Sequence, residues 1–193
     1  MSVAPGTAEL VRRVNLARML VTVHRDGPIS RAALTADLGL NRSTIGALTA
    51  ELARLGLVTE TAGAAEGRIG RPSPVITARP DVVAVAVNPE VDAVTLAAVG
   101  LDRRIHARRR AVTTTLITPH ALASLIAATI EEWRSGPLAT TRVIGVGVAV
   151  PGLVDPAAGL VVHAPHLRWT DAPLADLVTT ATGTPTTVGN DAS

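Results

Sequence analysis

Residues 27–58 constrain the fold more strongly than any other segment of this chain. Two short helical patterns lie here, preceded by the capping residues Ser30 and Asn41, and Gly39 separates them. Ser and Asn satisfy the free N–H groups at a helix start, and Gly adopts the left-handed conformation that ends a helix. The spacing predicts one helix from Ser30 to Gly39 and another from Asn41 to about residue 55. Two capped helices joined by a tight turn are typical of a helix-turn-helix.

A longer helix is predicted ahead of this motif, from residue 7 to about residue 24. Its apolar residues recur at helical spacing, so we expect one stripe to face the core. That stripe comprises Leu10, Val14, Ala17 and Val21. The predicted inward stripe of the third helix comprises Ile45, Leu48, Leu52 and Leu55.

The opposite face of the third helix is almost free of large side chains. It carries Ser43, Gly46, Ala47, Ala50 and Arg54. A helix with small outer residues can approach base edges in a major groove, and such helices make their contacts near the N-terminus. The DNA contacts predicted in this module are Arg31, Asn41, Arg42, Ser43, Thr44 and Ala47. The alternative is a three-helix bundle whose small face packs against another domain.

A β-hairpin is predicted after the third helix, with strands near residues 57–60 and 75–78 around a Gly-rich segment. Arg68 and Arg71 lie in that segment, beside glycines and Pro72. In a winged helix-turn-helix such arginines enter a minor groove or neutralise phosphates, and both are predicted DNA contacts. A solvated loop is the alternative, more credible for Arg68 alone than for the pair.

Charge and composition are consistent with this division. Of the 193 residues, 1–80 carry ten Arg and six acidic residues, whereas 81–193 carry eight Arg and ten acidic residues. A basic front module suits double-stranded DNA as the partner. The chain has no Cys, which excludes disulfides and cysteine-ligated zinc, and no signal peptide or membrane-spanning stretch is evident. We therefore expect a cytoplasmic protein that does not contact a membrane.

The remainder, residues 81–193, has an α/β pattern, so we place a domain boundary at residue 80. Strands are predicted at 82–87, 91–99, 104–112, 143–150, 160–163 and 186–188, and helices at 118–134 and 173–181. Residues 143–150 lack polar side chains, which indicates an interior strand. The arginines at 103–104 and 108–110 are interpreted as edge protection; a second nucleic-acid patch is the alternative.

The two modules together resemble the ROK family of bacterial repressors and sugar kinases. The resemblance is carried by the front module followed by Val-Ile-Gly-Val-Gly-Val-Ala-Val-Pro-Gly-Leu-Val-Asp, Ala-Pro-His-Leu-Arg-Trp and Val-Gly-Asn-Asp-Ala-Ser. It implies a winged helix-turn-helix at 1–80, then the first lobe of an actin-like, ribonuclease H-like domain at 81–193. It also implies a sugar site that includes His166, Asn190 and Asp191. The family's second lobe, with its zinc-binding motif, is missing after Ser193, so the sugar-binding domain is expected to be incomplete, either as a fragment or as a truncated product.

One loop departs from the family's kinases. Where they carry an Asp-x-Gly-Gly-Thr-like turn for nucleotide phosphates, this chain has Asn88, Pro89, Glu90, Val91 and Asp92. The glycines that allow close backbone approach are absent, and Pro89 lacks an N–H donor. This disfavours the alternative function, ATP-dependent hexose phosphorylation.

The predicted function is therefore a transcriptional regulator, a repressor of carbohydrate-metabolism genes with a sugar or sugar-phosphate effector. No catalytic residue, metal site or cofactor is assigned. Homodimerisation would require paired half-sites in the DNA. An interaction module controlled by another protein is a third hypothesis.

Overall fold

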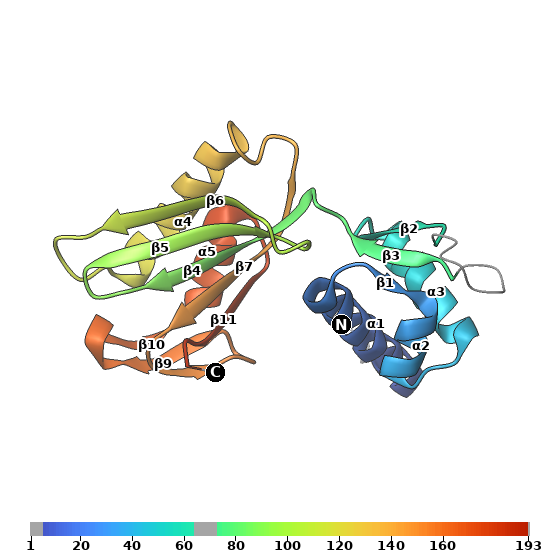
Figure 1. Cartoon of the computed structure of the whole chain (residues 1–193). Helices are drawn as coiled ribbons and strands as arrows, with labels where there is room; N and C mark the ends of the chain where they lie inside the picture. The colour runs from blue at the N-terminus through green and yellow to red at the C-terminus, as the bar shows by residue number, and fades with distance from the viewer. Residues whose placement is uncertain (1–5, 64–72, 193) are drawn as a thin grey trace. The chain divides into compact units, whose positions relative to one another are not determined.

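The computed structural model describes residues 6–63 and 73–192 (Figure 1). The chain divides into two compact units, residues 1–80 with 101–103, and residues 81–100 with 104–193. Within the described residues, no helix combines the length and the apolar character needed to cross a bilayer.

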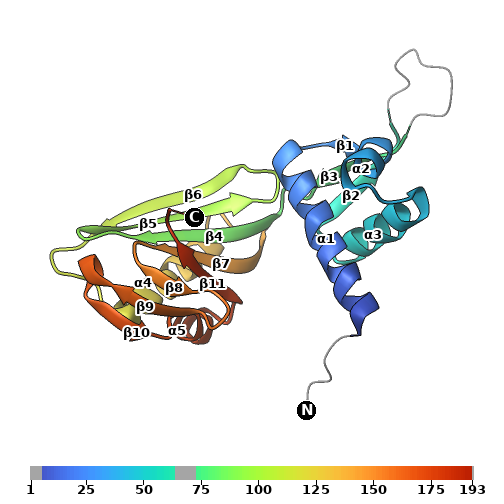
Figure 2. The same ribbon diagram turned by 90° about the horizontal axis from the view of Figure 1, so that it is seen from below.

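In its described residues, the first unit contains three helices and a small antiparallel sheet (Figure 2). The helices are α1 (Thr7–Asp26), α2 (Arg31–Leu38) and α3 (Arg42–Arg54). The strands, in the order β1-β3-β2, are β1 (Ile29–Ser30), β2 (Val58–Thr61) and β3 (Val75–Ala78). The prediction missed β1, whose two residues pair with β3.

Local capping sets the boundaries of α2 and α3. The Ser30 hydroxyl accepts a hydrogen bond from the Ala33 N–H at 3.2 Å. The Asn41 side chain accepts one from the Thr44 N–H at 2.8 Å. Gly39 ends α2 with φ of 65°, a left-handed conformation that favours glycine. Both helices therefore begin where the capping residues predicted.

The predicted inward face of α1 is wrong. Leu10, Val14 and Val21 are 54%, 50% and 58% exposed, and Ala17 is also exposed. The core of the unit instead receives the opposite face of α1, where Met19 and Val23 are fully buried. Helix α1 carries apolar residues on two faces, so periodicity alone did not identify the face that packs.

The second unit is built on a five-stranded mixed sheet of order β11-β7-β4-β5-β6. Strands β4, β7 and β11 run parallel, while β5 and β6 run antiparallel to their neighbours. The strands are β4 (Val82–Pro89), β5 (Ala93–Gly100), β6 (Ile105–Val112), β7 (Arg142–Val150) and β11 (Thr186–Asn190). Strand β7 is an interior strand, as predicted.

Helices α4 (Pro119–Arg134) and α5 (Leu174–Thr182) supply the core for one face of this sheet. The inward residues are aliphatic and alternate along the strands, as Val83, Val85 and Val87 do on β4. The Thr118 hydroxyl caps α4, which begins at Pro119 as predicted. The second unit is thus a mixed α/β fold with helices on one sheet face.

A second, three-stranded sheet follows β7, in the order β10-β9-β8. Its strands are β8 (Leu153–Asp155), β9 (Leu160–Ala164) and β10 (Trp169–Ala172), with the 3-10 turn η1 (Pro165–Leu167) between the last two. The sequence predicts no strand at the positions of β8 and β10. The buried Trp169 indole donates to the Ile117 carbonyl at 2.9 Å, which ties β10 to the segment before α4.

Candidate functional site

The N-terminus of α3 exposes three consecutive residues that were predicted to contact DNA. Asn41, Arg42 and Ser43 are exposed, and Thr44 is half-buried. The Ser43 hydroxyl donates to the Asn41 side-chain oxygen at 2.7 Å, the same oxygen that caps the Thr44 N–H. Within residues 6–63 and 73–192, no side-chain partner engages Arg42. The guanidinium of Arg42 is therefore the available cation at this helix end.

The outer face of α3 is small, as the sequence indicated. Ala47, Ala50 and Arg54 are exposed and Gly46 is half-exposed. The inner face buries Ile45, Leu48, Thr49 and Leu52. Leu55, predicted to face inward, is 40% exposed. It lies one residue beyond α3, where the chain turns into the segment before β2.

Arg31, a predicted DNA contact, is held by a carboxylate. Its Nε lies 2.5 Å from one Glu60 oxygen, and its Nη2 donates to the other at 2.7 Å. This ion pair joins the start of α2 to β2. A Cβ added at Gly46 would lie 3.7 Å from Arg31 Nη1, so the guanidinium also lies beside α3. Sequence analysis missed Glu60, because nothing local links it to Arg31.

The hairpin between β2 and β3 starts from the pair Thr61 and Val75. Arg68 and Arg71, the predicted wing contacts, lie outside the described residues. The return of the chain is anchored to α2, because the Pro74 carbonyl accepts from the Arg31 N–H at 2.9 Å. The Ser73 hydroxyl accepts from the Ala32 N–H at 3.2 Å.

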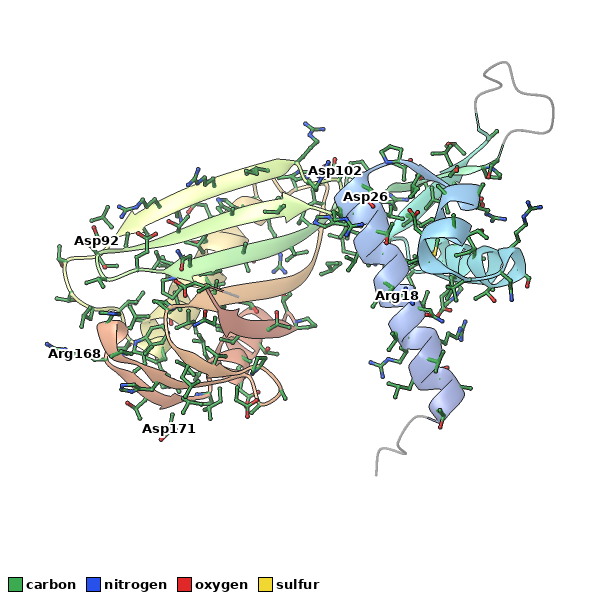
Figure 3. All side chains as sticks on the ribbon, turned by 60° about the horizontal axis from the view of Figure 1, so that its bottom comes forward. Arg18, Asp26, Asp92, Asp102, Arg168 and Asp171 are labelled. Atoms are coloured by element: carbon green, nitrogen blue, oxygen red, sulfur yellow. The ribbon has the colours of Figure 1, made fainter. Side chains whose placement is uncertain are left out.

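An ion pair lies at the C-terminal end of α1. The Arg25 guanidinium donates to both Asp26 carboxylate oxygens, at 2.7 and 3.0 Å. This hydrogen bonding lowers the pKa of the Asp26 carboxyl and raises the pKa of Arg25. Figure 3 labels Asp26 at the end of α1. The pair neutralises itself and adds no free charge to the unit.

In the second unit, the carboxyl ends of three parallel strands meet at one edge of the sheet. Asn190 of β11 lies beside Val150 of β7, and β4 ends at Pro89 on the same edge. In α/β sheets this edge is where ligands usually bind. The predicted sugar residues Asn190 and Asp191 lie there.

The amide of Asn190 is already engaged by its own chain. Its Nδ2 donates to the Gly152 carbonyl at 2.6 Å, and its Oδ1 accepts from the Ala192 N–H at 2.7 Å. Asp191 is exposed. This arrangement gives Asn190 a role in positioning the turn after β7 and leaves the Asp191 carboxylate facing solvent.

His166, the third predicted sugar residue, lies in η1 and is exposed. The backbone around it is unusual. Arg168 and Asp171, labelled in Figure 3, adopt positive φ values of 55° and 47°, which non-glycine residues seldom do. Backbone conformations of this kind are enriched at active sites and ligand-binding sites. Sequence reasoning had no signal for this.

The turn at residues 88–92 is closed by its own bonds. The Glu90 N–H donates to the Ala93 carbonyl at 2.7 Å, and Pro89 has no N–H to offer. The Glu90 carboxylate accepts from Thr95 at 3.0 Å and from Arg110 at 3.3 Å. A backbone cradle for phosphate is therefore absent from this described turn.

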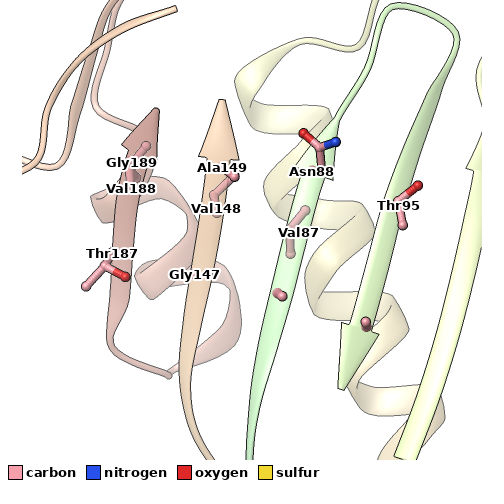
Figure 4. Close-up of a pocket in the computed structure, with 11 residues that line it drawn as sticks. Val87, Asn88, Thr95, Gly147, Val148, Ala149, Thr187, Val188 and Gly189 are labelled. Carbon is pink, nitrogen blue, oxygen red and sulfur yellow. The ribbon is translucent and has the colours of Figure 1, made fainter. Parts of the chain in front are cut away.

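The sheet face opposite α4 and α5 carries a hollow of about 410 Å³ (Figure 4). Its lining is mostly Ala, Val and Gly, and its polar side chains are Asn88, Thr95 and Thr187. His166, Asn190 and Asp191 do not line it. Gly189, which directly precedes Asn190, does line it. Among the described residues, no group of three or more His, Cys, Asp or Glu side chains could hold a metal ion.

The sequence of the second unit identifies the protein family. The ROK family profile matches residues 84–193, and the chain belongs to this family. The structure is similar to that of a solved ROK family transcriptional regulator, a homologue of the E. coli Mlc protein. The TM-score of the superposition is 0.71 and the sequence identity is 25%, over 94% of this chain and 46% of that one.

Curated relatives are also regulators. The xylose repressor of Caldicellulosiruptor bescii is 27% identical over 97% of this chain and 47% of its own length. The DNA-binding transcriptional dual regulator NagC of Escherichia coli K12 is 25% identical over 84% of this chain and 40% of its own length. The chain spans about half the length of the curated relatives it matches.

Proposed function

We propose that this chain is a DNA-binding transcriptional regulator that represses carbohydrate-metabolism genes in the cytoplasm and responds to a sugar or sugar phosphate. The observation that carries the proposal is the N-terminus of α3, where Arg42 is exposed and unpaired within the described residues beside a capped helix end. The N-terminal end of a helix and a free guanidinium together suit a DNA phosphate or a guanine edge.

The first unit is proposed to act as a winged helix-turn-helix. In this assignment α3 enters the major groove, and the β2–β3 hairpin is the wing that carries Arg68 and Arg71. Asn41, Ser43 and Thr44 hold the end of α3 in shape through their shared hydrogen bonds. Arg31 is assigned to the positioning of α2 against β2, because Glu60 occupies its guanidinium.

The second unit is proposed to sense the effector at the carboxyl edge of its sheet, through His166, Asn190 and Asp191. A sugar hydroxyl would then compete for the Asn190 amide, which now donates to the Gly152 carbonyl. Binding would move the turn after β7. The xylose repressor of Caldicellulosiruptor bescii and an N-acetylglucosamine repressor of Escherichia coli O157:H7, both similar to this chain, suggest xylose and N-acetylglucosamine, with their phosphates, as the first effectors to try.

The proposal includes no kinase activity. The turn at 88–92 lacks glycines and uses its Glu90 N–H internally, and its carboxylates would face a phosphate. Incubation of the chain with ATP and these sugars should yield no sugar phosphate. Turnover above a buffer control would contradict this part of the proposal.

DNA binding is tested by selecting bound duplexes from a random-sequence library and measuring their affinity by gel retardation. We expect a selected consensus and binding that weakens steeply with salt. Arg42→Ala should weaken binding to the consensus duplex by about tenfold, within the range of a lost bidentate base contact. Arg13→Ala is the matched control, because it removes an equal charge from exposed α1. Absence of a consensus, or equal losses in both variants, would reject the assignment.

A further inference from the structure

We propose that the exposed face of α1 is a docking surface for an amphipathic helix of another protein, one whose apolar residues are flanked by Asp and Glu. We call this surface the α1 stripe. Its apolar residues are Leu10, Val11, Val14, Ala17 and Val21, and Arg13 and Arg18 lie at its borders. The inference goes beyond the proposed function, because none of these residues is assigned to the contact with DNA.

The α1 stripe is as wide as a stripe that normally faces a protein core. With 3.6 residues per turn its apolar residues cover about 120° of the helix circumference, and core-facing stripes cover about 100° or more. Leu10, Val14 and Val21 are nevertheless at least half exposed. Met19 and Val23, on the opposite face, already supply the contribution of α1 to the core. Contiguous apolar residues exposed in this way mark interaction sites.

The spacing of the α1 stripe suits a helix as the partner. Residues 10, 14, 17 and 21 are separated by four, three and four positions, the spacing at which two α-helices pack along a shared seam. The seam extends over about 16 Å, from a rise of about 1.5 Å per residue. An amphipathic helix with apolar residues at the same spacing can therefore pack along three turns of α1.

The charges at the borders of the stripe select the kind of helix. Arg13 lies on one border and Arg18, labelled in Figure 3, on the other, and both are exposed. Within residues 6–63 and 73–192, no carboxylate engages either guanidinium. The two acidic residues of α1, Glu9 and Asp26, pair with other arginines of the same helix. The stripe therefore presents two unpaired positive charges, which Asp or Glu on a partner would complement.

A second copy of this chain does not supply that complement. If two α1 helices packed in parallel along this seam, Arg13 of each copy would lie beside Arg18 of the other. In an antiparallel pair each border meets the same border of the other copy, and arginines are the only charged residues on these borders. Both arrangements bring like charges together, which disfavours pairing.

A membrane surface is a poorer match than an acidic helix. Helices that lie in a bilayer interface carry Trp, Phe or Leu on their apolar face. The α1 stripe has one leucine, and its other members are valines and an alanine. Short β-branched side chains suit close packing against another helix better than insertion among lipid chains.

The experiment uses two synthetic helical peptides of three heptads each. Both carry leucine at the seam positions, and the flanking positions are all Glu in one peptide and all Lys in the other. Each carries fluorescein, and anisotropy measures its binding to the full chain. At low salt we expect the Glu peptide to bind about tenfold more tightly, because it gains two ion pairs and avoids two like-charge contacts. The difference should shrink as salt is added.

Variants of the chain assign the binding to the α1 stripe. Arg13→Glu combined with Arg18→Glu should reverse the preference and favour the Lys peptide, a result that loss of folding cannot produce. Val14→Asp should weaken binding of the Glu peptide by more than about tenfold, because it places an unpaired carboxylate in the seam. Ala8→Asp is the matched control, because it adds the same carboxylate to an exposed site of α1 outside the stripe. It should leave the affinity for the Glu peptide unchanged.

Equal affinities of the two peptides, or binding that Val14→Asp leaves intact, would overturn the inference. Two further measurements test the other occupants. A parent chain that sediments as a dimer, with a Val14→Asp variant that sediments as a monomer, would assign the stripe to a second copy. Binding to phosphatidylglycerol vesicles that Val14→Asp abolishes would assign it to a membrane. Either of these results would also overturn the inference.

Discussion

Gly152→Ala offers a sharp test of the packing described for the second unit. A Cβ at this position would lie 2.5 Å from the His163 carbonyl oxygen and 2.8 Å from Ala164 Cα. Both are backbone atoms of β9, so no side-chain rotation can relieve the overlap. The Gly152 carbonyl also accepts the hydrogen bond from Asn190, at 2.6 Å. Movement of the turn would therefore disturb that bond as well.

The expected loss of stability follows from these contacts. Forcing a methyl group into a packed site costs about 1–3 kcal/mol, and a weakened hydrogen bond adds about 0.5–1.5 kcal/mol. The two terms together have a central value of about 3 kcal/mol. With a urea m-value of about 2 kcal/mol/M, the unfolding midpoint should fall by about 1.5 M.

Tryptophan fluorescence reports on the second unit alone. Both tryptophans, Trp133 and Trp169, lie in the second unit and are buried there. A urea titration followed by their emission therefore reports unfolding of this unit. Gly189→Ala is the matched control, because its Cβ would meet no heavy atom within 4 Å. Equal midpoints for Gly152→Ala and the parent chain would refute the packing argument.

Three further predictions concern the first unit, and far-UV circular dichroism in urea measures them. Met19→Ala should destabilise this unit by about 2–5 kcal/mol, because Met19 is fully buried. Val14→Ala, at an exposed site, should change stability by less than about 0.5 kcal/mol. A larger loss for Val14→Ala than for Met19→Ala would instead support the inward face of α1 predicted from the sequence. Asn41→Ala should cost about 1 kcal/mol through the lost cap, while Asn41→Ser should retain most of it. Glu60→Gln should cost no more than about 1 kcal/mol, because the ion pair with Arg31 is part-exposed, and a larger loss would show that this pair does more than position β2.

Features governed by neighbouring residues were predictable from the sequence. Ser30, Asn41 and Thr118 cap helices in the structure because each oxygen reaches an N–H three residues later. Gly39 ends α2 for an equally local reason, its left-handed backbone. These interactions need no knowledge of the tertiary fold.

Features that depend on distant partners were not predictable in the same way. The packing face of α1 was misassigned, because the core selected Met19 and Val23 over the equally periodic Leu10 and Val14. The short strands β1 and β10 were missed, because each is defined by pairing with another strand.

The candidate sites show the same division. The exposure of Arg42 and Ala47 was expected from helix periodicity. The engagement of Arg31 by Glu60, twenty-nine residues later, was not expected. The bond from Asn190 to the Gly152 carbonyl likewise joins segments thirty-eight residues apart. The motifs therefore identified the positions of the candidate site residues. Hydrogen bonds between distant segments determine which of those side chains remain free.

The parallel pairing of β4 with β7 also has a consequence for the order of folding. Strand β4 can pair with β5 early, and β5 with β6. The other neighbour of β4, β7, is synthesised only after α4, and β11 follows α5. Such non-local pairing is slow because a long loop must close first. The three helices of the first unit depend on nearer contacts and are complete in the nascent chain before β4 emerges. We therefore expect the first unit to acquire its structure on the ribosome ahead of the second unit.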